Sequence, residues 1–258
     1  GLLDVIEGAE AEGVSTFEAI SVVETLDFGE GGHEEHDEHD DEAGDDEHSE
    51  ENGDDHSDDE HSEDHDDEHG TEEDHDEHDH SGADPHFFVD PVRMATAVDG
   101  IVGFLQEEID FADPAAVDAS AQAYATELAA LDADVVEILD SIPQERRVLV
   151  TNHEVFGYFA DRYDFEIAGV VIPGGSTTDS ASAGELAELV EVIEAEGVPA
   201  IFSDTSSSDQ LVQTLAGEVG DIEVVPLYTE SLGEPGSDGE TYLEMMRSNA
   251  ERISSALG

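Results

Sequence analysis

The stretch RVLVTNHEVFGYFADRYDFEIAGVVI at residues 147–172 decides the fold, because it reads as strand, helix and strand in turn. Residues 147–151 and 167–172 are strand-like apolar runs, and residues 155–163 between them are helical in character. Two strands joined by a crossover helix are the unit from which parallel sheets are built. The stretch therefore predicts an α/β fold.

The same alternation continues to the end of the chain. Ser182-Ala183-Gly184-Glu185 has the sequence of a capping box and opens a predicted helix at residues 186–196. Repeated units with short connections predict a mostly parallel sheet covered on both faces, with ligands beyond the carboxyl ends of its strands. Further strands are expected at residues 200–203 and 222–227, and further helices at residues 209–219 and 242–257.

Proline marks the start of two helices ahead of this region. Pro91 suits the first turn of one helix, and Asp113-Pro114 has the sequence of an N-cap followed by Pro at the first helical position. The second helix would run to Leu139 and reach roughly 40 Å at about 1.5 Å per residue. It is long enough to be a rigid strut between two lobes, although an ordinary surface helix fits the same spacing equally well.

The first 29 residues contain two short apolar runs, which cannot close a core alone. Residues 2–6 form one run, and residues 19–23 form the other, which is rich enough in β-branched side chains to predict a strand. Since the chain begins with Gly1 rather than Met, we expect a fragment. A missing export signal is therefore no evidence for a cytoplasmic location.

The charge of the chain is extreme, because 71 acidic residues face six basic ones, all Arg, for a formal net charge of −65. Outside residues 30–85 the six Arg still face 41 acidic residues. Charges at this density repel one another unless concentrated salt screens them, since the Debye length is about 3 Å near 1 M salt. The pattern is typical of a protein that works in concentrated salt. It excludes nucleic acid and anionic lipid as direct ligands, because nothing neutralises phosphates.

The chain contains no Cys, so any metal site has to use His and carboxylate side chains. No run approaches the roughly 20 apolar residues of a membrane span. We therefore expect no direct insertion of this chain into a membrane.

A low-complexity segment of His, Asp and Glu, residues 30–83, holds eleven of the thirteen histidines. Imidazole binds Zn²⁺, Cu²⁺ and Ni²⁺ well, and carboxylates draw cations in. Because the segment has almost no apolar side chains, we expect it to be disordered and to collect metal ions, with a solvated acidic spacer as the alternative. Its candidate ligands are His33, His36, His39, His48, His56, His61, His65, His69, His75, His78 and His80.

Two histidines, His86 and His153, lie outside this segment. His86 precedes a predicted helix, and His153 closely follows the apolar strand at residues 148–150, where the ligands of parallel sheets gather. A lone loop histidine is more often structural than functional. Two of them, in a chain that also carries a metal-collecting segment, indicate a defined metal site.

Catalytic patterns are weak. His153-Glu154 begins a zinc-peptidase motif, but Gly157 stands where the second His belongs, and Gly174-Gly175-Ser176 lacks the Lys of a phosphate loop and predicts a plain turn. Ser206-Ser207-Ser208 has no partnering base. We therefore predict that the chain is not an enzyme and has no catalytic residues.

Four features resemble those of the extracytoplasmic zinc- and manganese-binding proteins of ABC metal importers. Residues 84–91, DPHFFVDP, are similar to the family's Asp-Pro-His-aromatic-Leu-Asp-Pro signature, and residues 151–163, TNHEVFGYFADRY, are similar to its second His motif. The acidic segment resembles the His-rich insertion of zinc-type members. The family's terminal helix is matched by Tyr242, Met245, Met246 and Asn249.

The resemblance implies two α/β lobes of mostly parallel sheet, joined by one long helix, with the metal between them. It assigns residues 1–112 to an incomplete amino-terminal lobe, 113–142 to the linking helix and 143–258 to the carboxy-terminal lobe. Family members present their first His upstream of anything in this chain. That ligand is therefore expected to be missing.

Carried over to this sequence, the family's ligands fall on His86 and His153. The fourth ligand is a carboxylate after the last strand, usually Asp, and Glu230 stands in that place, with Asp204 as the alternative. Zinc would then have three of its usual four ligands. A histidine of the acidic segment or a water would fill the vacancy, and binding is expected to be weaker than in a complete member.

The function implied by the resemblance is capture of Zn²⁺ outside the cell and its delivery to an ABC-type membrane permease. Zn²⁺ is favoured over Mn²⁺ because imidazoles suit zinc better. We expect a monomer at the cell surface, anchored to the membrane in the full-length protein. A metal buffer acting through the His-rich segment is the alternative. A zinc-dependent hydrolase is a weaker one, since no general base can be named.

Overall fold

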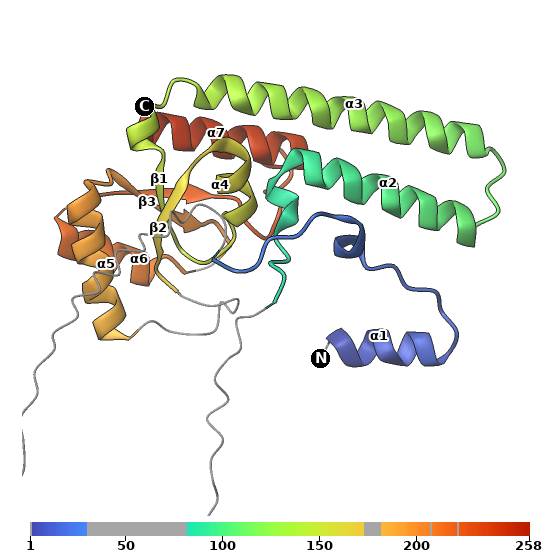
Figure 1. The fold of residues 1–258 in the computed structure, drawn as a ribbon, viewed down its shortest axis with the longest axis horizontal. Coiled ribbons are helices and arrows are strands. Elements are labelled where there is room, and N and C mark those ends of the chain that lie inside the picture. The colour runs from blue at the N-terminus through green and yellow to red at the C-terminus, as the bar shows by residue number, and fades with distance from the viewer. Residues whose placement is uncertain (1, 30–81, 173–181, 207, 221) are drawn as a thin grey trace, which may run out of the picture. The chain divides into compact units, whose positions relative to one another are not determined.

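The computed structural model describes residues 2–29, 82–172, 182–206, 208–220 and 222–258 (Figure 1). The eleven histidines of the acidic segment and the turn predicted at Gly174-Gly175-Ser176 lie outside these residues. Ser207 lies outside them as well.

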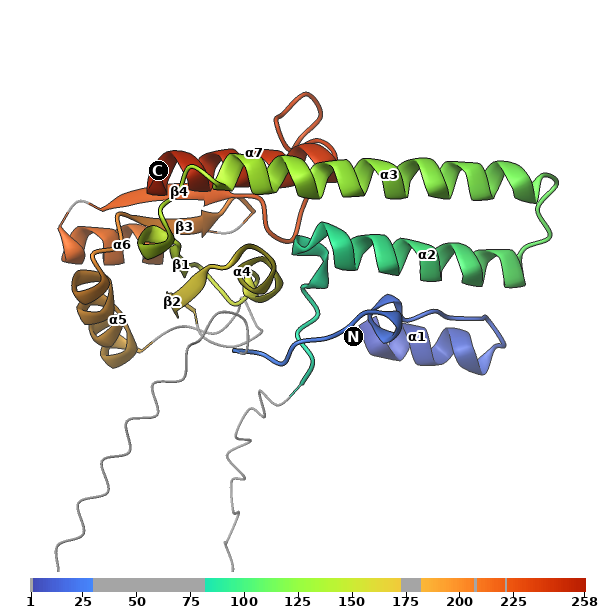
Figure 2. The same ribbon diagram turned by 45° about the horizontal axis from the view of Figure 1, so that its top comes forward.

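Four parallel strands form one sheet in the order β2-β1-β3-β4 (Figure 2). Parallel neighbours require crossover connections, and helices supply them here. β3 lies between β1 and β4 and is buried at every residue. The predicted α/β fold with a parallel sheet is confirmed. The strands are β1 Val148–Thr151, β2 Glu166–Val170, β3 Ala200–Asp204 and β4 Glu223–Leu227.

Helices cover both faces of the sheet. Neighbouring residues of a strand point to opposite faces, so they pack against different helices. Leu149 and Phe202 belong to a hydrophobic cluster shared with α3, α4 and α7. Val150 and Ile201, one residue away in each strand, belong to a second cluster shared with α5 and α6. The helices of this region are α4 Gly157–Tyr163, α5 Ala183–Glu196, α6 Gln210–Val219 and α7 Tyr242–Leu257.

The predicted helix starts are confirmed at three places. Asp90 caps α2 by accepting from the backbone N–H of Val92, and Asp113 caps α3 by accepting from Ala116. Ser182 and Glu185 form the reciprocal pair of the capping box at α5. The helices ahead of the sheet are α1 Leu2–Ala11, α2 Pro91–Glu108 and α3 Pro114–Leu139, and the short 3-10 turns are η1 Ala19–Val22, η2 Phe87–Val89 and η3 Gln144–Arg146.

The long helix α3 has 26 residues and lies beside α2 and α7 (Figure 2). Its carboxy-terminal half packs into the first hydrophobic cluster. Arg162 of α4 binds Asp132, and Arg247 of α7 binds Asp134, so two neighbouring helices are fastened to the same part of α3. Its buried side chains are Leu128, Leu131, Val135 and Leu139.

All six Arg of the chain are bonded within the fold. Four of them bind carboxylates, and two bind backbone carbonyls alone. Each guanidinium therefore has at least one partner within the described residues. The pairs are Arg93 with Asp90 and Asp161, Arg146 with the Gly258 carbonyl, Arg147 with the Tyr163 and Leu139 carbonyls, Arg162 with Asp132, Arg247 with Asp134, and Arg252 with Asp238.

The strand predicted at residues 19–23 is wrong. This run forms the 3-10 turn η1 followed by extended chain. A strand needs a hydrogen-bonding neighbour, and in the described residues before β1 the β-type pairing is a single bridge between Asp27 and Ala83. Val22 packs against Gly100 of α2, where a Cβ would overlap it. Tertiary packing therefore overrides the β-branched composition.

Among the described residues, no helix combines the length and the hydrophobicity needed to cross a bilayer.

Candidate metal centre

Three predicted ligands lie together in the structure. His86, His153 and Glu230 each offer one ligand atom, and these atoms all lie within 4.8 Å of one another. The imidazole centroids are 6.0 Å apart, and the Glu230 carboxylate oxygens are 3.9 Å from His86 Nε2 and 3.7 Å from His153 Nε2. Bonds of about 2.0–2.2 Å to a central zinc ion would place neighbouring ligand atoms roughly 3.3–3.6 Å apart. The ligand atoms are therefore close to the spacing that a bound ion requires.

The sheet delivers two of these residues to one edge. His153 follows the carboxyl end of β1, and Glu230 follows the carboxyl end of β4. The His153 carbonyl accepts from the Thr151 hydroxyl at 3.0 Å and from the Val155 N–H at 2.9 Å, which holds the chain in a tight turn after the strand. Parallel strands end at a common edge, so residues far apart in sequence can meet there.

His86 is oriented by the residue two positions before it. Asp84 Oδ1 lies 2.6 Å from His86 Nδ1 and also accepts from the backbone N–H of His86 at 2.9 Å. Both side chains are buried. A carboxylate on Nδ1 favours the proton at that nitrogen and leaves the Nε2 lone pair toward Glu230, the arrangement that metal-binding histidines use. Asp84 lies in the motif at residues 84–91, but the motif did not predict this supporting role.

The His153 ring is buried and has no hydrogen-bond partner at either nitrogen within the described residues. Burial lowers the pKa of His153, and the nearby carboxylates of Glu230 and Asp204 offset this only in part. The imidazole is therefore neutral at pH 7. A buried polar group without a partner is costly, and a bound cation would satisfy it.

Tyr158 joins the segment carrying His86 to the helix that follows His153. Its hydroxyl donates to the backbone carbonyl of Asp84 at 2.7 Å and accepts from the backbone N–H of Leu26 at 3.0 Å. Tyr158 lies in α4, and its side chain is fully buried. Tyr158 therefore links the segment that carries His86 to the helix that follows His153.

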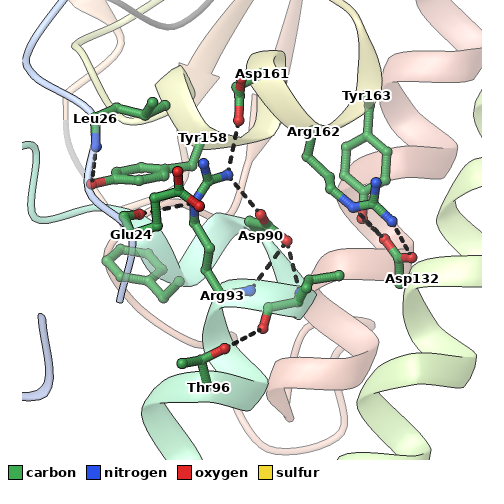
Figure 3. A network of polar contacts seen from close by, with 12 residues as sticks. Glu24, Leu26, Asp90, Arg93, Thr96, Asp132, Tyr158, Asp161, Arg162 and Tyr163 are labelled. Carbon is green, nitrogen blue, oxygen red and sulfur yellow. Dashed lines mark hydrogen bonds and ion pairs between the residues drawn. The ribbon is translucent and has the colours of Figure 1, made fainter. Parts of the chain in front are cut away.

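Arg93 holds Tyr158 from the other side (Figure 3). Its guanidinium lies 4.9 Å from the centroid of the Tyr158 ring. It also binds Asp90 at 2.8 Å, Asp161 at 2.9 Å and the Glu24 carbonyl at 3.1 Å. The contacts span α2, α4 and the amino-terminal segment, so this corner of the site is braced by groups from three parts of the chain.

Asp204, the alternative ligand, does not join the group of three among the described residues. It lies at the end of β3, and its buried carboxylate accepts from the Ser206 N–H at 2.7 Å and from the Ser206 hydroxyl at 2.9 Å. These bonds also engage the first serine of Ser206-Ser207-Ser208. Asp204 contributes negative potential near His153 rather than a ligand atom in this arrangement.

The sheet and the gathered His and carboxylate groups define an α/β protein with a candidate site for a divalent cation. Residues 3–256 match the family described as zinc-uptake complex component A, periplasmic (ZnuA). The chain belongs to this family. The resemblance predicted from the sequence is confirmed, and the description is that of an uptake component, not of an enzyme.

Known proteins of related sequence bind different metals. The chain is 38% identical to the zinc-binding protein TroA of Treponema pallidum over 141 residues, which are 53% of this chain and 45% of that protein. It is 26% identical to the manganese-binding lipoprotein MntA of Halalkalibacterium halodurans over 69% of this chain and 59% of that protein. The chain spans about half the length of the curated relatives it matches.

The fold is also similar to a solved structure, the periplasmic zinc-binding protein TroA from Treponema pallidum. The TM-score is 0.64 at 32% sequence identity, and the match covers 70% of this chain and 66% of that one. The fold predicted from the sequence is therefore that of a known metal-binding protein.

Proposed function

We propose that this chain captures Zn²⁺ outside the cell through His86, His153 and Glu230 and delivers it to an ABC-type membrane permease. The observation that carries the proposal is the convergence of two buried imidazoles and one carboxylate within 4.8 Å. The unpartnered Nε2 of His153, which faces Glu230, supports it, because a bound cation would satisfy that nitrogen. The zinc-binding relative TroA supports the choice of cargo.

Zn²⁺ is preferred over Mn²⁺ on the chemistry of the ligands. Two imidazoles with one carboxylate suit zinc, whereas manganese favours sites richer in oxygen. The relatives described as manganese-binding make Mn²⁺ the second candidate. Three protein ligands leave a fourth position of a tetrahedral zinc ion for a water or for another side chain.

Metal titration by calorimetry tests the proposal. Zn²⁺ and Mn²⁺ are titrated at about 1 M salt, where charge repulsion is screened, into the intact chain, a chain lacking residues 30–80, and the double variant His86→Ala/His153→Ala. We expect tight zinc binding that survives removal of the segment and is lost in the double variant. Tight binding with the opposite pattern would instead make the chain a buffer acting through its His-rich segment.

The cellular location and the oligomeric state of the chain are part of the proposal. Matched relatives are described as periplasmic or as lipoproteins, which supports an extracytoplasmic, membrane-anchored protein. We propose that it works as a monomer beside its permease. Sedimentation in concentrated salt, with and without zinc, measures the oligomeric state, and a zinc-dependent dimer would contradict this part.

A further inference from the structure

The three ligand side chains of the proposed site differ in how firmly the surrounding structure holds them. His86 and His153 are 6% and 3% exposed. The Glu230 side chain is 45% exposed and lies on the loop that joins β4 to α7. A ligand on a loop binds well only if other contacts hold that loop in place. The contacts that do so converge on one residue, Tyr228.

The start of the loop is fixed to α7 through its backbone. The Asn249 side chain accepts from the Tyr228 N–H at 2.9 Å and donates to the Tyr228 carbonyl at 2.6 Å. Asn249 and Tyr228 are both buried. The peptide groups just before Glu230 are therefore anchored by a pair of hydrogen bonds from one amide.

The far part of the loop returns to the Tyr228 ring. The Gly233 N–H donates to the Gly239 carbonyl at 2.8 Å. Gly239 is buried against the Tyr228 ring, so closely that a Cβ would overlap the ring. Glu230 therefore lies on a short tether between its anchored neighbour Tyr228 and the closed Gly233–Gly239 pair.

Asp238 fastens this arrangement. Its carboxylate accepts from the Tyr228 hydroxyl at 2.7 Å, from the Ser248 hydroxyl at 2.8 Å and from the Arg252 guanidinium at 2.8 and 3.1 Å. Arg252 also lies 4.7 Å from the centroid of the Tyr228 ring and donates to the Pro226 carbonyl at 2.7 Å. The Tyr228 hydroxyl, followed by Arg252 and Ser248, holds the pKa of Asp238 far below its usual range.

We propose that Asp238 is a positioning residue of the metal site, which holds Tyr228 and the loop so that Glu230 meets the ion bound by the two histidines. The inference rests on the proposed function. Asp238 contacts none of the three ligands in the structure, so any effect on the metal has to pass through the loop. The charge and geometry of its bonds, rather than metal contact, give it this role.

The variant Asp238→Ala tests the role, with Glu234→Ala as the matched control. Glu234 lies on the same loop, carries the same charge and is exposed, and within the described residues its side chain makes no hydrogen bond or ion pair. Supporting residues of metal ligands typically change affinity by about 10–100-fold. We expect a loss of this size in zinc affinity for Asp238→Ala, mainly through faster release, and little change for Glu234→Ala. Asp238→Asn keeps an acceptor oxygen and should recover part of the loss.

A double-mutant cycle with Glu230→Gln separates positioning from general destabilisation. If Asp238 acts through Glu230, Asp238→Ala or Asp238→Asn weakens zinc binding in the parent chain but adds nothing once Glu230→Gln is present. Equal losses in both backgrounds would overturn the inference, as would equal affinities of Asp238→Ala and Glu234→Ala. Failure of the parent chain to bind zinc would refute the proposed function itself. Zinc binding that depends on Glu230 but not on Asp238 would refute only the positioning role.

Discussion

Replacing Asp84 by Asn isolates the contact that orients His86. The substitution keeps the shape of the side chain but removes the charge that lies 2.6 Å from His86 Nδ1. An amide oxygen can still accept from the His86 backbone, which the carboxylate binds at 2.9 Å. The main loss is therefore the preference for a proton on Nδ1 and a free Nε2.

The expected magnitude follows from the strength of that bond. A hydrogen bond to a charged group contributes about 1.5–3 kcal/mol, and a neutral one about 0.5–1.5 kcal/mol. The difference, about 1–1.5 kcal/mol, corresponds to roughly a tenfold change in a binding constant. Zinc affinity of Asp84→Asn should fall about tenfold, at the lower end of the range for residues that support metal ligands.

The assay is a competition titration against a zinc chelator at about 1 M salt, where long-range charge effects are screened. Glu154→Gln is the control, because Glu154 adjoins His153 and its side chain makes no hydrogen bond or ion pair within the described residues. Equal affinities of Asp84→Asn and Glu154→Gln would show that overall charge, not orientation of His86, governs binding. Unchanged affinity in Asp84→Asn would refute the reasoning outright.

Three further predictions concern stability. Burial lowers the pKa of His153 in the folded, metal-free chain. The unfolded chain therefore takes up a proton on this residue near pH 6.5, whereas the folded chain does not. This contribution to stability falls as the pH drops from about 7.5 to about 5.5. Thermal unfolding of parent and His153→Gln should show a smaller pH effect in the variant, and parallel curves would contradict it. Phe159→Ala removes a fully buried ring that contacts Phe156, Tyr163 and Phe165 and should cost about 3–5 kcal/mol in denaturant unfolding, whereas a cost below about 1 kcal/mol would contradict the packing. Arg93→Met loses two ion pairs and a ring contact. It should lower the free energy of unfolding by about 1–3 kcal/mol in the same denaturant measurement. An unchanged denaturation midpoint would show that these contacts contribute nothing to stability.

The sequence predicted best where local chemistry decides structure. Asp113-Pro114 and the capping box at Ser182 gave correct helix starts, because caps act within a few residues. The apolar runs of the sheet were found for a similar reason, since buried parallel strands are continuously hydrophobic. The run at residues 19–23 failed because pairing depends on a neighbouring strand that the sequence does not reveal.

For the site, the sequence predicted which residues to examine but not what supports them. His86, His153 and Glu230 come together in the structure, and the assignment of metal binding to them stays a prediction. The bond between Asp84 and His86 could have been predicted from the sequence, because the two residues are near neighbours in one motif. The contacts of Asp238 were not, since Tyr228, Ser248 and Arg252 are brought together only by the fold.

The internal pairing of every Arg limits how other molecules can dock on this chain. All six guanidinium groups already bond carboxylates or carbonyls within the described residues, and the whole chain has a formal net charge of −65. The positive charge of a complementary interface must then come from the partner molecule. If the proposed delivery to a permease is correct, the permease surface that meets this protein would have to be basic, and the affinity of that encounter should fall as the salt concentration rises.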